Sequence, residues 1–89
     1  MNKYVLQNAR EYLGRDVEIK PSTRKFKKYM VLKPDGKWSY FGDNRYEDYT
    51  QHRNDERKKN YLARAKNIKG NWKNDKYSPN NLSIHILWN

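Results

Sequence analysis

Alternating runs of large apolar residues predict a β-hairpin in the middle of the chain, over residues 28–42. Two runs rich in β-branched and aromatic residues, Tyr29–Leu32 and Trp38–Phe41, flank a Pro-Asp-Gly sequence at residues 34–36. Proline presets φ at the first corner of a turn, aspartate suits the second corner, and glycine can take the left-handed position that closes such a loop. Both faces of this hairpin carry large apolar side chains, so we expect something to cover each face. An isolated hairpin is only marginally stable in water, and the flanking segments must therefore complete the core.

The start of the chain predicts a short amphipathic helix and then an edge strand. Over residues 1–14, Asn2 can cap the helix, apolar residues follow at helical spacing, and Gly14 stands where a helix typically ends. Residues 15–20 alternate between polar and apolar, and Pro21 stops this strand because proline cannot donate a hydrogen bond to a neighbouring strand. The apolar stripe of the helix consists of Val5, Leu6, Ala9, Tyr12 and Leu13.

After the hairpin the pattern changes to helical spacing. Residues 42–44 predict a turn with a helix cap, and residues 45–52 predict one or two helical turns with Tyr46 and Tyr49 on one side. A stronger helix is expected over residues 56–67, because the acidic residues near its start suit the helix dipole. Its candidate caps are Asn54 and Asp55, and its apolar stripe is Tyr61, Leu62, Ala65 and Ile68.

The last residues carry two competing signals. Every second residue from Leu82 to Trp88 is apolar, which favours a strand, whereas Ser78 and Pro79 are a good N-cap and first helical residue. We predict a helix for residues 79–88, with the strand as the open alternative. A segment this apolar in so polar a chain must dock onto something.

A strong excess of basic residues changes what such a fold can be used for. The chain has 20 Lys and Arg against 10 Asp and Glu, which gives a net charge of +10. A charge this large points to a polyanionic partner: nucleic acid, an anionic membrane surface or an acidic protein. Eighty-nine residues with a hydrophobic share of 35% make one domain with a small core. No stretch is long and apolar enough to span a bilayer and no signal-peptide core is present, so we expect a protein that is not secreted.

No residue pattern predicts catalysis or metal binding. The two histidines, His52 and His85, lack the short spacings typical of metal sites, and the chain has no cysteine. No nucleophile motif is present, and the acidic pairs at residues 47–48 and 55–56 stand where helices begin, which capping explains. We therefore expect no catalytic residue, no metal, no cofactor and no small-molecule substrate.

Basic residues interleaved with aromatic residues are the strongest functional signal. No acidic residue occurs between Lys20 and Lys33, and residues 22–28 form a basic connector around Phe26. Lysine and arginine can neutralise phosphates whatever the base sequence, and exposed aromatic rings can stack on bases. The alternatives are a solvated loop that protects a sheet edge and a basic surface that only confers solubility. The predicted nucleic-acid-binding residues are Arg24, Lys25, Lys27 and Lys28 in the connector and Arg57, Lys58 and Arg64 in the following helix.

Several blocks of sequence resemble a known family. The blocks are KFKKYMV, GKW with FGD, RYEDYT, the helix ERKKNYLARAKNIKG, and SPNNLSI with a closing LW. In this order they resemble an uncharacterised family of small basic proteins encoded by large double-stranded DNA viruses, including relatives of mimiviruses and phycodnaviruses, and by some phages. The likeness covers about residues 25–88 and leaves residues 1–23 outside. That family has no established activity, so the resemblance implies only a viral setting and a role in the virion or with the genome.

Together these patterns predict one α+β domain over residues 1–89, with a two- or three-stranded antiparallel sheet built on the hairpin 28–42 and packed with about three short helices. The expected function is non-enzymatic binding of nucleic acid, with DNA preferred, in a virion or in the host-cell interior (cytoplasm or virus factory). The alternative is a minor capsid or cement protein. In that case the basic face would meet acidic capsid surfaces, and the tyrosines and the apolar tail would be buried between neighbours. A small regulatory or nuclease-accessory protein is a third hypothesis.

Overall fold

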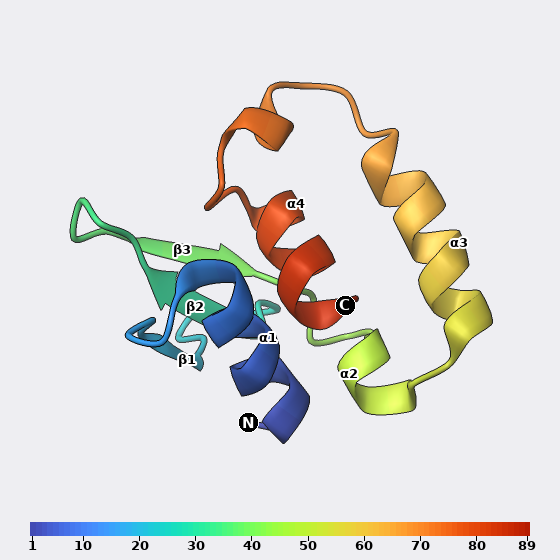
Figure 1. The fold of residues 1–89 in the computed structure, drawn as a ribbon, viewed down its shortest axis with the longest axis horizontal. Coiled ribbons are helices and arrows are strands. Elements are labelled where there is room, and N and C mark those ends of the chain that lie inside the picture. The colour runs from blue at the N-terminus through green and yellow to red at the C-terminus, as the bar shows by residue number, and fades with distance from the viewer.

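A three-stranded antiparallel sheet, in the order β1-β2-β3, is the platform on which the helices pack (Figure 1). The computed structural model describes residues 1–89, with strands β1 (Ile19–Pro21), β2 (Tyr29–Leu32) and β3 (Trp38–Phe41). The hairpin predicted from the sequence is confirmed, because Tyr29 pairs with Phe41 and Leu32 pairs with Trp38. The predicted edge strand is also confirmed, but it is short and reaches Pro21 instead of stopping before it.

The turn between β2 and β3 has the geometry that its sequence predicts. The Gly36 amide donates to the Lys33 carbonyl at 3.0 Å, and the Lys33 amide donates to the Lys37 carbonyl at 2.8 Å. The Asp35 carboxylate accepts a hydrogen bond from the Lys37 amide at 2.9 Å. Gly36 has a φ of 84°, which is the left-handed conformation that glycine adopts without steric cost.

Helix α1 (Lys3–Leu13) begins and ends at the residues that the sequence predicts. The Asn2 side chain accepts from the Val5 amide at 3.0 Å, and the Gly14 amide donates to the Arg10 carbonyl at the other end. Val5 is fully buried, so the apolar stripe of this helix faces the core, as expected.

The last residues form a helix and supply the centre of the core. Helix α4 (Pro79–Leu82) is capped by Ser78 and continues as a π-helix, η2 (Ser83–Leu87); we call the two together the C-terminal helix. The predicted helix is therefore correct and the strand alternative is wrong, because the local start signal outweighs the alternation of apolar residues. The core cluster joins this helix to α1 and the sheet. It consists of Val5, Ala9, Val31, Phe41, Leu82, Ile86 and Leu87.

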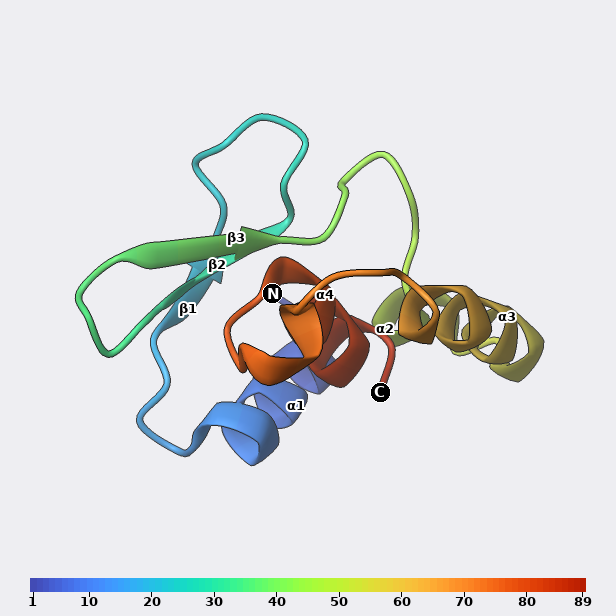
Figure 2. The same cartoon turned by 90° about the horizontal axis from the view of Figure 1, so that it is seen from above.

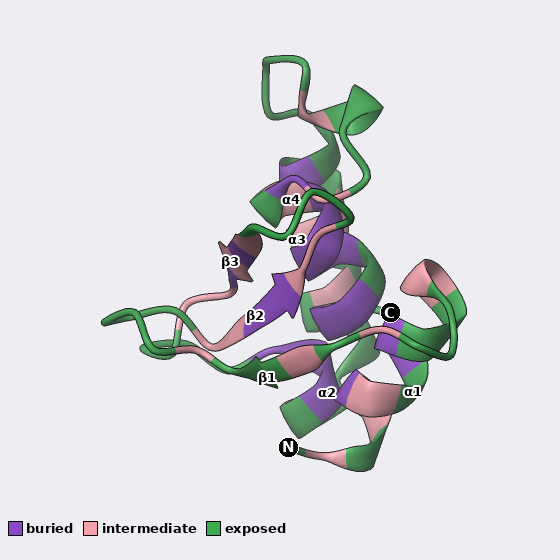
Figure 3. Cartoon of the chain, turned by 90° about the vertical axis from the view of Figure 1, so that its left-hand side faces the viewer, coloured by how far each residue is buried: buried purple, intermediate pink, exposed green.

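The two faces of the sheet are covered in different ways. Helix α1 and the C-terminal helix lie against one face (Figure 2), where Val31 and Phe41 are fully buried. Side chains of the preceding segment lie over the opposite face: the Arg24 guanidinium lies 4.0 Å from the centre of the Tyr40 ring, and the Lys20 ammonium lies 5.2 Å from that of Trp38. The hairpin's second apolar face is thus left without a helix. Buried residues gather on β2, β3 and the helices that pack against them, whereas most of the connecting segments are exposed or half-buried (Figure 3).

Two helices connect the sheet to the C-terminal helix, α2 (Tyr49–His52) and α3 (Asp55–Lys66). The cap of α2 is Asp48, so the cap predicted at residues 42–44 is wrong, and Tyr46 lies outside the helix instead of sharing a side with Tyr49. Helix α3 is capped by Asn54, one of the two predicted caps. A short 3₁₀ helix, η1 (Trp72–Asn74), then leads back toward the C-terminal helix. With four α-helices, the fold is α+β as predicted, and the three-stranded form of the sheet is the correct one.

Helix α3 is held to the rest of the domain by few contacts. Trp88 stacks on Tyr61 with ring centres 4.1 Å apart and planes 10° apart, and the Asn80 side chain donates to the Ala65 carbonyl at 3.2 Å. Ala65 is the one buried residue of this helix, and Ile68, expected on its apolar stripe, lies beyond the helix end and is 53% exposed. None of the helices combines the length and the apolar character that crossing a membrane requires.

Replacing Gly36 by valine should lower the free energy of unfolding by about 1–2 kcal/mol, because a β-branched residue is strained at positive φ. No atom lies within 4 Å of the position that a Cβ atom would occupy at Gly36, so the loss would come from the backbone and not from a clash. Gly36→Asn is the matched control, since asparagine tolerates this conformation and should cost less. Urea unfolding of the three proteins measures both effects, and equal stability of the valine variant would contradict the turn geometry.

Candidate nucleic-acid interface

Most of the basic side chains of this protein have no acidic partner. Five ion pairs, with nitrogen–oxygen distances of 2.6 to 3.8 Å, use five of the twenty lysines and arginines, which leaves fifteen outside ion pairs. Exposed ion pairs contribute little to stability, and unpaired cations are free to meet an anion. The positive charge is therefore available at the surface.

The connector between β1 and β2 presents three of these free cations. Arg24, Lys25 and Lys27 are exposed and take part in no ion pair. Phe26 lies among them at a φ of 67°, with the Arg45 guanidinium 4.4 Å and the Lys25 ammonium 5.0 Å from the centre of its ring. Cation–π contacts leave the positive charge in place, so these side chains can still contact phosphate.

Lys28, the fourth predicted connector residue, has a different role. Its ammonium lies 2.6 Å from the Asp48 carboxylate and 2.8 Å from the Gln51 side-chain oxygen, and the Lys28 and Asp48 side chains are only 10% and 4% exposed. Asp48 also caps α2 by accepting from the Thr50 amide and hydroxyl. Lys28 thus fastens the hairpin to α2 and is not the free cation that the sequence suggests, because its partner comes from a segment distant in sequence. Its contact with phosphate stays a prediction.

The three basic residues of α3 that are predicted to bind nucleic acid lie in different surroundings. The Arg57 guanidinium lies 3.5 Å from the Glu47 carboxylate, and the Lys58 ammonium lies 4.6 Å from the centre of the Tyr49 ring. Arg64 has no ion pair and lines a cleft on the inner side of the helix. The seven predicted residues therefore do not share one site: Lys27, Lys28 and Arg64 line this cleft, and the other four do not.

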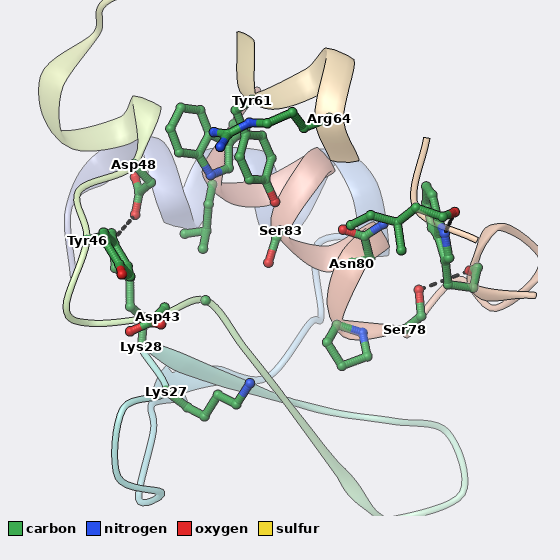
Figure 4. A pocket seen from close by; sticks show the side chains of 16 residues that line it. Lys27, Lys28, Asp43, Tyr46, Asp48, Tyr61, Arg64, Ser78, Asn80 and Ser83 are labelled. Carbon is green, nitrogen blue, oxygen red and sulfur yellow. Dashed lines mark hydrogen bonds and ion pairs between the residues drawn. The ribbon is translucent and has the colours of Figure 1, made fainter. Parts of the chain in front are cut away.

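The cleft lies between α3, the C-terminal helix and the segment that leaves the hairpin, and has a volume of about 760 Å³ (Figure 4). In this view Lys27 extends from the sheet side, whereas Arg64 comes from α3 on the opposite side, and Tyr61 points toward Ser83. Tyr46, Ile68 and Trp72 add apolar surface to the walls. We call it the α3 cleft.

The acidic residues of the α3 cleft are neutralised by lysine and arginine side chains. Asp48 pairs with Lys28, and Asp43 accepts hydrogen bonds from the Arg45 guanidinium at 2.8 and 3.0 Å. The hydrogen bonds from Arg45 lower the pKa of Asp43 to about 2, so this carboxylate stays ionised and paired at any physiological pH. Burial raises the pKa of Tyr61, whose hydroxyl therefore stays neutral. The charge that remains in the cleft is positive.

Sequence reasoning missed three residues of this cleft. The sequence predicts Tyr46 on a helix face and Ile68 on the apolar stripe of α3, and it assigns Trp72 to no site. Each carries a signal of its own, an aromatic or aliphatic residue in a polar stretch, but nothing local indicates that they meet. The two histidines lie outside this cleft: His52 ends α2, and His85 is exposed and stacks on Tyr12 with ring centres 4.3 Å apart. No group of three His, Asp or Glu side chains gathers as metal ligands do.

The chain matches the model of a family of unknown function (DUF5754) over residues 17–65. The chain belongs to this family. The segment that DUF5754 covers holds the whole sheet, the connector, α2, most of α3 and all seven predicted binding residues. Helix α1 and the C-terminal helix, which supply much of the core, lie outside it. No curated protein and no solved structure matches the chain.

Replacing Lys28 by serine should lower the free energy of unfolding by about 3 kcal/mol, because it leaves the buried Asp48 carboxylate without its cation. Lys27→Ser removes the same charge from an exposed neighbour and should change stability by no more than about 0.5 kcal/mol. Thermal or chemical unfolding followed by circular dichroism compares the two. Equal stabilities would show that the Lys28–Asp48 pair does not hold the hairpin to α2.

Proposed function

We propose that this DUF5754 protein is a non-enzymatic nucleic-acid-binding protein that contacts phosphates without strong sequence preference. The observation that carries the proposal is the surplus of fifteen lysines and arginines outside ion pairs, three of them on a connector that contains no acidic residue. Cations that need not break an ion pair first can displace the counterions of a polyanion, which is the main source of non-specific affinity for DNA.

The distribution of charge supports a sequence-independent mode of binding. Free cations occur on the connector, on α3 and near the carboxyl end of α3, on several sides of a small domain. Recognition of a base sequence needs a few side chains held in register along a groove of the nucleic acid, whereas scattered cations contact only its phosphates. The proposal includes the viral setting that the resemblance implies: a virion component or a protein of the infected cell that accompanies the genome.

The capsid alternative loses two of its arguments. The apolar tail is not available to neighbours, because Leu82, Ile86 and Leu87 are buried in the core of the same chain. Spare tyrosines are also lacking, since Tyr46 alone of the eight tyrosines is exposed. The basic surface could meet acidic proteins as well as nucleic acid, but no further observation favours that partner.

Binding to duplexes of unrelated sequence should be similar in affinity and should weaken steeply with salt. The logarithm of the affinity is expected to fall linearly with the logarithm of the salt concentration, by about 0.9 for each phosphate contacted. Fluorescence anisotropy of two labelled duplexes, titrated at several salt concentrations, measures both properties. A flat salt response, or no binding at low salt, would contradict the proposed function.

The connector should contribute more to duplex binding than the helix does. Replacing Arg24, Lys25 and Lys27 together by serine removes three free cations. Replacing Arg57, Lys58 and Arg64 by glutamine removes only two free cations, because Arg57 is paired with Glu47. The first variant should therefore lose more affinity and more of the salt slope, by about one per lost contact. Both variants change the charge equally, and circular dichroism checks that both fold. A larger loss in the helix variant would place the interface on α3.

A further inference from the structure

Exposed apolar surface and unpaired positive charge coincide in one place, the α3 cleft. The exposed large hydrophobic residues of this protein are Met1, Phe26, Tyr46 and Ile68, and two of these four, Tyr46 and Ile68, line the cleft. Single exposed apolar residues are common on protein surfaces, but two that line one hollow between elements indicate a binding surface.

Tyr46 is the aromatic ring that is free to receive a ligand. It is 69% exposed, and neither another ring nor a cation lies against it. The ring of Phe26, the other exposed aromatic side chain, is occupied by Lys25 and Arg45. The loop that carries Tyr46 is fixed by the hydrogen bond of its amide to the Asp43 carbonyl at 3.1 Å. A flat apolar face is thus presented at a defined position.

The charges around this ring suit a phosphate group. Lys27 and Arg64 approach the α3 cleft from opposite sides (Figure 4), and neither forms an ion pair. The carboxylates nearby, Asp43 and Asp48, are already neutralised by Arg45 and Lys28, so they do not repel an anion strongly. An aromatic face and two cations that line the same cleft are the combination that binds a base and its phosphates.

The shape of the cleft selects between forms of nucleic acid. A volume of about 760 Å³ lies within the range of sites for one small molecule, and it is a hollow between α3 and the C-terminal helix rather than a flat surface. Paired bases are stacked inside a duplex and cannot reach into such a hollow, whereas the bases of a single strand can turn outward.

We propose that the α3 cleft binds an unpaired nucleotide of a single-stranded nucleic acid, with the base stacked on Tyr46 and the phosphates held by Lys27 and Arg64. This inference rests on the proposed nucleic-acid binding and adds a preference for single strands over duplexes. The free cations outside the cleft bind phosphates of either form, and the cleft supplies the difference between them.

The test compares a labelled oligothymidylate with a duplex of the same length, at one salt concentration, for the unaltered protein and for Tyr46→Ala. The single strand should bind more tightly, and Tyr46→Ala should weaken its binding about tenfold while leaving duplex binding unchanged. Tyr46→Phe is the matched control, because it keeps the ring and should keep the preference. Folding of each variant is checked by circular dichroism, and the exposure of Tyr46 makes a folding defect unexpected.

Two charge-matched pairs test the phosphate contacts. Lys27→Gln and Arg64→Gln should reduce the preference for the single strand. The controls are Lys37→Gln at the tip of the hairpin and Lys66→Gln on α3, both outside the cleft, and each should lower the affinity for the single strand and for the duplex equally. Equal binding of both ligands would overturn this inference and leave the proposed function standing. No binding of either would overturn both. Thymidine monophosphate that competes as well as the strand would also overturn it, in favour of a free-nucleotide site.

Discussion

The packing of the C-terminal helix is the interaction on which the rest of the structure depends. Leu82 and Ile86 are fully buried in one cluster with residues of α1 and of the sheet. The C-terminal helix therefore joins α1 to the sheet. The same helix holds the distant parts of the chain. Asn8 of α1 donates to the Ile86 carbonyl at 2.9 Å, and Asn81 donates to the Trp72 carbonyl at 2.8 Å. In a domain with so small a core, burial of these few side chains supplies most of the driving force for folding.

The buried ion pair between Lys28 and Asp48 is the second constraint, and it determines how the cleft is shaped. It fixes the end of the hairpin against α2, while Trp88 fixes α3 through its stack on Tyr61. Gly42 lies between these contacts at a φ of 78°, where a Cβ atom would come within 2.8 Å of the Leu87 side chain. The backbone therefore approaches the C-terminal helix closely at this point, and the hollow opens beyond it, under α3. Removing either partner would leave the other charge buried and uncompensated, so both side chains are needed to keep this geometry.

Because the core is small, most residues of this protein lie at its surface, and so do the basic side chains on which the proposed binding depends. Eighteen of the 89 residues are buried, and the free lysines and arginines are distributed over the remainder. Such a surface would favour nucleic acid of any sequence, and the α3 cleft would add a preference for one form of it. The two contributions are separable, because the first depends on charge alone and the second on one ring and two cations.

The sequence alone determined the elements whose signals are local. Asn2, Asn54 and Ser78 cap their helices and Gly36 closes the hairpin turn as predicted, because each of these residues acts on backbone within a few positions of itself. Only the tertiary structure decided the rest. Lys28 looks like a free cation in the sequence because its carboxylate partner follows much later in the chain, and the sheet face behind Tyr40 is predicted to be covered although no helix reaches it. Lys27 and Arg64 are each predicted as binding residues, but their positions on opposite sides of one cleft depend on how the C-terminal helix places α3 relative to the sheet. Contacts between distant segments follow from the packing of the whole core, and no short stretch of sequence encodes them.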